Sequence, residues 1–276
     1  MKIVIQESLG RMGQGLASSV VWIPECEPIF WNPASKPIMD MFDEVKPDIV
    51  ISAGEIFLDK ATKFAKKAYP KTIMICAGPI EDYLVEPNFC IGEYQHKNLP
   101  LLAFGDGPMV GKIGNPSVEQ HLKSDVVCIT SNIREFTELD NQIIQYLGSM
   151  SSIVFKAFGT NKIPVKNYLG IVDHQTEADA INSSKIVLDL DGGSGYDGLW
   201  LKKNVITTKQ IDFSTRISNV LECKKALDEI LIQEENPALR SLVQTRTYFD
   251  LACNMFRFVG LEDHANFMLR KKGELL

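Results

Sequence analysis

A glycine-rich segment in the second half of the chain carries the residue types that hold a phosphate group. Four of the seven residues at 192–198 are glycine, and an apolar run at 186–190 precedes them. Glycines let backbone N–H groups approach a ligand closely, and the start of a helix adds partial positive charge. The segment therefore predicts a diphosphate site, and the alternative is a tight turn with left-handed glycines.

A second glycine pattern follows the first apolar run of the chain. Gly10, Gly13 and Gly15 lie in a segment at 8–15, directly after a predicted strand at 2–6. Their order differs from the G-x-G-x-x-G of dinucleotide-binding loops, so the pattern alone has low specificity. It predicts either a flexible loop that reaches a phosphate or an acceptor, or a plain connection from a strand to a helix.

Composition and charge exclude several classes of protein. The chain has 276 residues, of which 45% are hydrophobic and 23% charged, as in ordinary globular domains. No apolar run approaches the ~18 residues that a membrane span needs, and the start shows no signal-peptide pattern. The net charge of −6 gives no overall basic field for nucleic acid. We expect a cytoplasmic protein.

The cysteines and acidic residues show no spacing typical of a metal site. The six cysteines include no C-x-x-C pair, and Cys76 and Cys128 lie within apolar strand patterns, so reduced, buried thiols are expected. Asp189 and Asp191 have D-x-D spacing, but Asp189 lies within an apolar strand pattern. We therefore expect no essential metal.

Strand and helix patterns alternate along the first half of the chain, which is typical of a parallel sheet covered by helices. The predicted strands lie at 2–6, 27–31, 47–53 and 72–76, and the predicted helices lie at 38–45 and 59–69. The segment at 81–115 is rich in proline, glycine and aromatic residues. We interpret it as the edge of a first domain and the approach to a linker.

A second alternating unit begins near residue 125. The predicted strands lie at 126–130, 153–158, 168–172, 186–190 and 205–208. The predicted helices lie at 137–148, 176–183 and 220–233, and a mostly helical segment follows at 246–272. Thr176 and the pair Ser218-Asn219 are the expected helix caps.

The order of these patterns resembles the nucleotide-sugar-binding domain of GT-B glycosyltransferases. Phe158-Gly159 follows the second strand of this unit, Gly170-Ile-Val172 precedes a helix, and N-S-S-K-I-V-L-D-L at 182–190 leads into the glycine-rich segment. The likeness covers roughly residues 125–250, and it is to phage DNA glucosyltransferases and to glycosyltransferases related to spore-maturation proteins. It implies an α/β fold with two Rossmann-like domains facing across a cleft and a C-terminal helix crossing back to the first domain.

The resemblance also implies a role for each part of the chain. An acceptor-side domain would span 1–122, a nucleotide-sugar-binding domain 123–246, and a helical tail at 247–276 would pack on the first domain. The implied donor-binding residues are Gly10, Gly13, Phe158, Gly159, Val172, Asp191, Gly193, Ser194, Gly195, Tyr196 and Asp197. GT-B enzymes stabilise the leaving diphosphate with a helix dipole and basic groups instead of a metal ion.

One departure from the family pattern concerns the helix after the glycine-rich segment. These families have Arg-x-x-Glu there, and the matching positions in this chain are Tyr196 and Leu199. On a shifted register Asp197 could replace the glutamate of this motif, and Lys202 or Lys203 could replace its arginine. Otherwise donor binding would be altered or lost.

An inverting transferase also needs a carboxylate or a histidine to take the proton of the acceptor hydroxyl. Phage β-glucosyltransferases have an aspartate just after the fourth strand of the first domain, where this chain has Glu81 and Asp82. Asp106 lies in a later loop, and His96 is a more remote candidate. A retaining transferase needs no such base, so the assignment stays open.

The sequence therefore predicts a metal-independent glycosyltransferase that moves a sugar from a nucleotide-diphosphate sugar to an acceptor hydroxyl. The nucleotide sugar, a UDP-sugar for example, is a co-substrate, and no cofactor or membrane span is expected. The acceptor stays open between hydroxymethylated phage DNA, a small molecule, a protein and a glycan. The alternatives are a nucleotide- or sugar-nucleotide-binding module without transferase activity, and a sugar-nucleotide epimerase.

Overall fold

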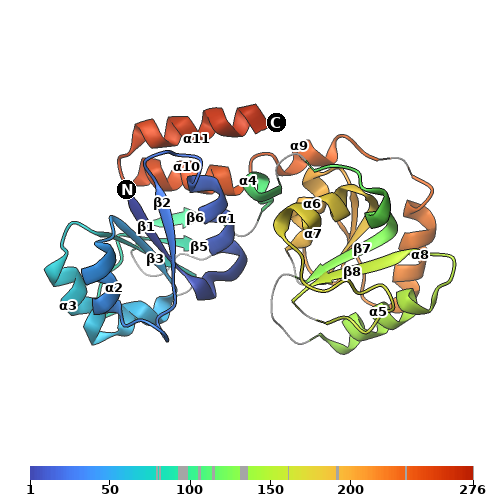
Figure 1. The fold of residues 1–276 in the computed structure, drawn as a ribbon, viewed down its shortest axis with the longest axis horizontal. Helices are drawn as coiled ribbons and strands as arrows, with labels where there is room; N and C mark the ends of the chain where they lie inside the picture. The colour runs from blue at the N-terminus through green and yellow to red at the C-terminus, as the bar shows by residue number, and fades with distance from the viewer. Residues whose placement is uncertain are drawn as a thin grey trace. The chain divides into compact units, whose positions relative to one another are not determined.

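The chain divides into two compact units, which are described separately (Figure 1). In the computed structural model the first unit contains Met1–Gly105 and Tyr248–Glu274, and the second contains Asp106–Thr247. The structure describes residues 1–78, 80, 82–92, 99–104, 107–113, 116–130, 136–160, 162–190, 193–233 and 235–275. The boundary predicted at residue 122 lies later in the chain than this division.

The first unit contains a parallel sheet of six strands in the order β2-β1-β3-β4-β5-β6. The strands are β1 (Lys2–Gln6), β2 (Glu27–Trp31), β3 (Ile49–Ser52), β4 (Ile73–Ala77), β5 (Phe89–Gly92) and β6 (Leu101–Ala103). The first four lie where the apolar runs predict them. The segment at 81–115, interpreted as the edge of the first domain, contains the last two strands of this sheet, with β6 at its edge, and the division between the two units after Gly105.

Helices cover both faces of this sheet (Figure 1). On one face, α2 (Ile38–Val45) and α3 (Lys60–Ala68) pack on alternate strand residues such as Val4. On the other face lie α1 (Gly10–Val20) and α10 (Tyr248–Phe258), and the ring of Phe258 lies 4.6 Å from that of Phe89 on β5. The last helix, α11 (Glu262–Leu275), follows α10. The helical tail therefore belongs to the first unit.

The glycine pattern at 8–15 forms a helix and not the predicted flexible loop. A 3-10 turn at Glu7–Leu9 follows β1, and α1 begins at Gly10. A Cβ atom on Gly13 would lie 3.0 Å from Cγ2 of Ile5, and one on Gly15 would lie 2.4 Å from Cγ of Tyr248. The glycines at 13 and 15 therefore allow α1 to pack closely on β1 and α10.

The second unit contains a parallel sheet of five strands in the order β11-β10-β9-β7-β8. The strands are β7 (Ser124–Thr130), β8 (Phe155–Gly159), β9 (Ser184–Asp189), β10 (Asn204–Thr207) and β11 (Thr215–Arg216). The strand predicted at 168–172 is wrong, because only an isolated bridge joins Tyr168 to Ala157 there. The short strand β11 carries no pattern that predicts it.

The helices of this unit are α4 (Val110–Ile113), α5 (Glu138–Ser149), α6 (His174–Asn182), α7 (Ser194–Trp200), α8 (Val220–Ile230) and α9 (Leu239–Val243). Asn219 caps α8 as predicted, since its Oδ1 accepts a hydrogen bond from the N–H of Glu222. The cap predicted at Thr176 is wrong. Asp173 caps α6, and its Oδ1 accepts from the N–H of Thr176 at 2.8 Å.

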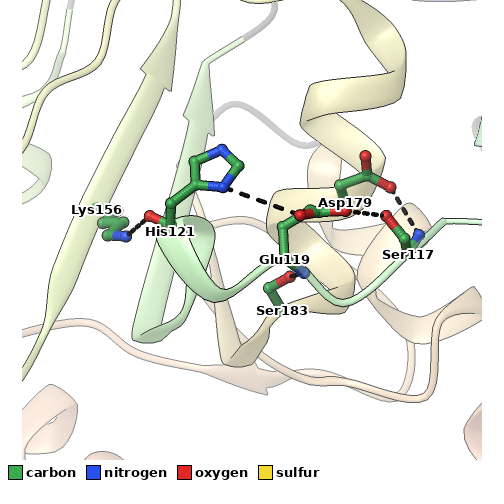
Figure 2. A network of polar contacts seen from close by, with 6 residues as sticks. All are labelled: Ser117, Glu119, His121, Lys156, Asp179 and Ser183. Atoms are coloured by element: carbon green, nitrogen blue, oxygen red, sulfur yellow. Dashed lines mark hydrogen bonds and ion pairs between the residues drawn. The ribbon is translucent and has the colours of Figure 1, made fainter.

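The segment before β7 is tied to the C-terminal half of α6 (Figure 2). The N–H of Ser117 donates to Oδ1 of Asp179 at 2.7 Å, and the N–H of Glu119 donates to Oγ of Ser183 at 2.8 Å. These bonds explain why residues 116–122, predicted as the end of the first domain, belong to the second unit. Among the described helices, none has the length and apolar character required to cross a membrane.

Candidate functional site

The order of the second sheet creates a switch point between β7 and β9. The chain leaves β7 toward α5, whose Ile143 packs with Val126 and Cys128 on one face. It leaves β9 toward α7, where Gly198 lies against Val187 on the other face. In open α/β sheets, ligands bind beside the carboxyl ends of the strands at such a point. The candidate site is therefore the carboxyl edge of β7, β9 and β10.

A buried polar network holds this edge together. Oγ of Ser194, the first residue of α7, donates to Oδ1 of Asp189 at 2.9 Å. Oγ1 of Thr207, the last residue of β10, lies 3.4 Å from the other carboxylate oxygen of Asp189 and accepts from the N–H of Lys209 at 3.0 Å. Ser194, Asp189 and Thr207 are at most 2% exposed. The network fixes the start of α7 beside the ends of two strands.

The predicted glycine-rich segment is mostly helix. Because α7 begins at Ser194, Gly195 and Gly198 lie within it, and neither has a positive φ. A Cβ atom on Gly195 would lie 3.3 Å from Cβ of Asp189, and one on Gly198 would lie 2.8 Å from a methyl carbon of Val187. The alternative of a turn with left-handed glycines is wrong for these two, which instead let α7 pack closely on β9. Asp191 and Gly192 lie outside the described residues.

The start of the short helix α7 differs from the starts of the longer helices α5, α6 and α8. Thr137, Asp173 and Asn219 each cap a helix with a side-chain oxygen, and the bonds from Thr176 lower the pKa of the Asp173 carboxyl. No side chain of the described residues caps α7 at Gly193. The start of a helix carries partial positive charge, which attracts anions.

The charged residues that could replace Arg-x-x-Glu have other partners. Tyr196 is 9% exposed and Leu199 is fully buried. Asp197 is buried, and its Oδ1 accepts from the N–H of Met109 at 2.9 Å, which ties α7 to the segment before α4. Lys203 is buried in an ion pair with Glu235.

Lys202 and Lys203 cannot supply the positive charge of the missing arginine at the carboxyl edge of β7, β9 and β10. Both follow the C-terminal end of α7 and precede β10, which begins at Asn204. They therefore lie at the amino edge of the parallel sheet, opposite Asp189 and Ser194. The prediction that either lysine replaces the arginine is wrong for this reason.

Three of the predicted donor-binding residues lie at the end of β8 or beyond it. Gly159 has φ +121°, and a Cβ atom there would lie 2.2 Å from the carbonyl oxygen of its neighbour Thr130 on β7. The N–H of Gly159 donates to the carbonyl of Gly170 at 3.0 Å, which brings the 168–172 segment to this strand end. Phe158 is a buried core residue, and Val172 is half-buried just before the cap of α6. Gly159 and Val172 thus lie near the same edge as Ser194.

A cavity of about 20 Å³ lies between α4, α6 and α7. Lys112, His174, Glu177, Ser194 and Asp197 are among its lining residues. Nδ1 of His174 lies 3.3 Å from Oε2 of Glu177. This volume holds about one water molecule and no larger ligand. The cavity is therefore lined by polar side chains next to the start of α7, but it is too small for a nucleotide.

Lys209 is a basic residue at this edge that is not among the residues predicted from the sequence. It lies two residues beyond β10 and is half-buried. Within the part of the chain that the structure describes, its ammonium group has no ion-pair partner. The signal that could have indicated it is a lysine directly after the strand pattern V-I-T-T.

The first unit has its own switch point, between β1 and β3. Oε1 of the buried Gln6 accepts from the N–H of Ala53 at 2.9 Å, and its Nε2 donates to Oε1 of Glu55 at 2.9 Å. Glu55 is exposed. A fixed amide thus orients an exposed carboxylate at this carboxyl edge, a residue that the sequence analysis also missed.

The remaining predicted residues are only partly described. Asp82 is exposed in the first unit, whereas Glu81, His96 and Asp106 lie outside the described residues. Gly10 and Gly13 lie in α1 of the first unit, so their role in donor binding stays a prediction. No three His, Cys, Asp or Glu residues of the described ranges are grouped so that they could hold a metal ion. All six cysteines are free and buried.

The chain is similar to solved structures of proteins in complex with UDP, although no protein-family model and no curated protein matches its sequence. HepE of Anabaena, in complex with UDP and glucose, gives a TM-score of 0.63 at 8% identity over 94% of this chain and 99% of that chain. A MnaA–UDP structure from S. aureus gives a TM-score of 0.55 at 11% identity, and the match covers 94% of this chain and 97% of that chain.

A third similar structure is a UDP-GlcNAc 2-epimerase from Methanocaldococcus jannaschii in complex with UDP-GlcNAc and UDP. It gives a TM-score of 0.53 at 10% identity, and the match covers 88% of this chain and 98% of that chain. At these identities the matches establish architecture. With its two parallel sheets of six and five strands, the chain has the two-unit α/β fold of the GT-B type.

Proposed function

We propose that the second unit binds the nucleoside diphosphate part of a sugar nucleotide, most simply UDP-sugar, at the carboxyl edge of β7, β9 and β10. The observation that carries this proposal is the switch point at β7 and β9, where the Asp189–Ser194–Thr207 network holds the start of α7. A UDP-GlcNAc 2-epimerase and two further proteins of the same fold have been solved in complex with UDP.

The residues at the edge suggest how the diphosphate is held. The start of α7 supplies partial positive charge from the helix dipole. The ammonium group of Lys209 supplies a full charge two residues beyond β10. Together they replace the arginine that the glycosyltransferase pattern has on the helix itself. Stabilising a departing diphosphate in this way needs charge and donors fixed in place, and the buried network fixes α7.

We infer that the reaction is glycosyl transfer from this donor to a hydroxyl. The acceptor oxygen forms a bond to the anomeric carbon as the bond to the diphosphate breaks, and in an inverting transfer a carboxylate takes the hydroxyl proton. Glu55, held by Gln6, is the best-supported candidate for that carboxylate in the first unit, and Asp82 is the second. Glu81 and Asp106 remain candidates from the sequence.

A second candidate function is epimerisation of the sugar nucleotide. Its support is that solved structures of a UDP-GlcNAc 2-epimerase and a putative one match 88% and 97% of the chain. A binding module without turnover is the third. All three share the nucleotide site, and they differ in what happens to the sugar.

Product analysis distinguishes these functions. The protein is incubated with UDP-glucose, UDP-GlcNAc and UDP-galactose, alone and with acceptors, and the products are separated by anion-exchange chromatography. The acceptor panel contains free sugars, a serine-rich peptide and duplex DNA with hydroxymethylated bases. Glycosyl transfer predicts UDP release that depends on one acceptor. A new UDP-sugar without UDP release would establish epimerisation, and tight UDP binding without any product would establish a binding module.

A further inference from the structure

The outer side of α3 carries a basic and apolar surface that the proposed sugar-nucleotide chemistry does not use. A hollow of about 670 Å³ opens here in the first unit. We call it the α3 surface, and its lining residues are Lys60, Lys63, Phe64, Lys66, Lys67, Leu84 and Val85.

The helical period separates this surface from the core. Thr62 and Ala65 are fully buried against the first sheet. Residues 60, 63, 64 and 67 repeat at intervals of three and four, so they share the outer side of the helix. Phe64 is 65% exposed there. A large apolar side chain thus projects into solvent between lysines.

A second apolar side chain is fixed beside the helix by the main chain. The N–H groups of Leu84 and Val85 donate to the carbonyl of Phe57 at 2.8 and 3.1 Å. Leu84 is 51% exposed. Because backbone bonds hold this segment, Leu84 and Phe64 form a prearranged apolar pair on the same hollow.

The charge of this surface is opposite to that of the whole chain. The chain has a net charge of −6, yet the lining contains four lysines and no acidic residue. Lys66 donates to the carbonyl of Thr72. Lys60, Lys63 and Lys67 form no ion pair with any residue that the structure describes. The surface therefore presents uncompensated positive charge around an apolar centre.

We propose that the α3 surface docks on a bilayer that contains anionic phospholipid. Lysines attract the negative surface of such a bilayer, while their aliphatic stems lie along the apolar centre. Phe64 and Leu84 would enter the boundary between headgroups and acyl chains, as the apolar side of an interfacial helix does. A nucleic acid would account for the lysines. It would leave the exposed aliphatic side chain of Leu84 without a role, because bases stack on aromatic side chains.

Vesicle sedimentation tests the proposal with the full-length protein. We expect binding to vesicles of phosphatidylcholine mixed with phosphatidylglycerol, weaker binding at high salt, and no binding to phosphatidylcholine alone. Each lysine near an anionic bilayer is worth about fivefold in affinity, so K63Q/K67Q should bind roughly 25-fold more weakly. The matched control is K224Q/K225Q on α8, which should bind like the wild type.

The apolar contribution is tested with F64S, which removes an exposed side chain and leaves the core unchanged. It should weaken vesicle binding while UDP binding stays the same, since the inference goes beyond the nucleotide site. Equal vesicle binding by wild type and K63Q/K67Q would overturn the proposal, as would no vesicle binding at all. Binding to duplex DNA that exceeds vesicle binding and is unaffected by F64S would identify a nucleic-acid surface instead.

Discussion

Oγ of Ser194 donates a hydrogen bond to Oδ1 of Asp189 at 2.9 Å, and both side chains are almost completely buried. Asp189 ends β9 and Ser194 begins α7. The bond therefore closes the connection between strand and helix from inside the protein, and the start of α7 does not depend on a ligand for its position. A site whose donors are fixed in this way needs little rearrangement when an anion binds.

Replacing Ser194 tests this bond. S194A should lower the free energy of unfolding by about 1–3 kcal/mol, because the buried carboxylate of Asp189 loses a donor. It should also weaken UDP binding, because α7 is less firmly placed. Urea unfolding and calorimetry measure the two effects. The control is S241A on the exposed side of α9, where we expect a change within about 0.5 kcal/mol. Equal effects of S194A and S241A would contradict the structural role of the bond.

Lys209 provides a test of the electrostatic part of the site. K209A should weaken UDP binding about 10- to 100-fold, since a charge-assisted hydrogen bond contributes about 1.5–3 kcal/mol. K224A removes a lysine from the exposed side of α8 and should leave UDP affinity unchanged. Calorimetric titration of both variants gives the comparison. A similar loss in K209A and K224A would show that overall charge, and not the position of Lys209, determines the affinity.

The acceptor-side carboxylate is tested by its effect on turnover. On the acceptor found by the product analysis, E55Q should lower the turnover number about 10²- to 10⁴-fold, the usual contribution of a general base, while UDP affinity stays the same. D82N, assayed in parallel, tests the second candidate, and E86Q serves as a control on an exposed glutamate of the same unit. Normal turnover in E55Q would exclude Glu55 as the base.

Two helical glycines of the first unit should respond in opposite directions to alanine. A Cβ atom on Gly15 would lie 2.4 Å from the buried ring of Tyr248, so G15A should lower the free energy of unfolding by about 1–3 kcal/mol or more. Gly273 in α11 has open space around it, and G273A should raise that free energy by up to about 1 kcal/mol. Urea unfolding of both variants checks the pair. Equal stability of G15A and wild type would contradict the packing of α1 on α10.

The buried thiols predict how stability changes at alkaline pH. Burial raises the pKa of Cys76 to about 12 and the pKa values of Cys26 and Cys223 to about 11, from a usual value of 9.0. As the pH rises, these thiols ionise in the unfolded chain before they ionise in the folded protein. Their contribution to the free energy of unfolding is therefore complete below pH 9.0, and it is lost progressively as the pH rises toward the pKa values of the folded protein.

Urea unfolding measured from about pH 8 to about pH 10 tests whether the free energy of unfolding falls as the pH rises. Stability should fall over this range, and it should fall less steeply in C76A, which removes one of the three thiols. The native protein should also resist thiol reagents at about pH 8, because its thiols are protonated and buried. Rapid labelling of the folded protein, or an identical pH dependence in C76A, would contradict the assignment.

The sequence predicts those parts of the fold that depend on long apolar runs. Buried parallel strands read as continuous apolar segments, so β1, β3, β7 and β9 lie where they are expected. The strands β5 and β6 are only four and three residues long, and they are strands because a neighbouring strand pairs with them. Such pairing is a tertiary effect that local patterns do not contain.

The glycines show the same limit. The local sequence around Gly15 predicts a loop. In the structure Gly15 lies in a helix against Tyr248, which is far away in the sequence, so the local pattern does not contain the reason for this glycine. The edge of the proposed site follows from strand patterns, and so Ser194 is among the predicted residues. Lys209 and Glu55 are not, because they become candidates only once it is known which strand ends are adjacent in the sheets.

Calorimetric titration of the protein with UDP tests the central claim most directly. We expect saturable binding at one site, and at a UDP concentration of about 100 Kd the protein should gain about 2.7 kcal/mol of stability against urea. The binding should be weaker in K209A and unchanged in K224A. No heat of binding and no stabilisation by UDP, or by UDP-glucose and UDP-GlcNAc, would contradict the assignment of the β7–β9–β10 edge as a sugar-nucleotide site.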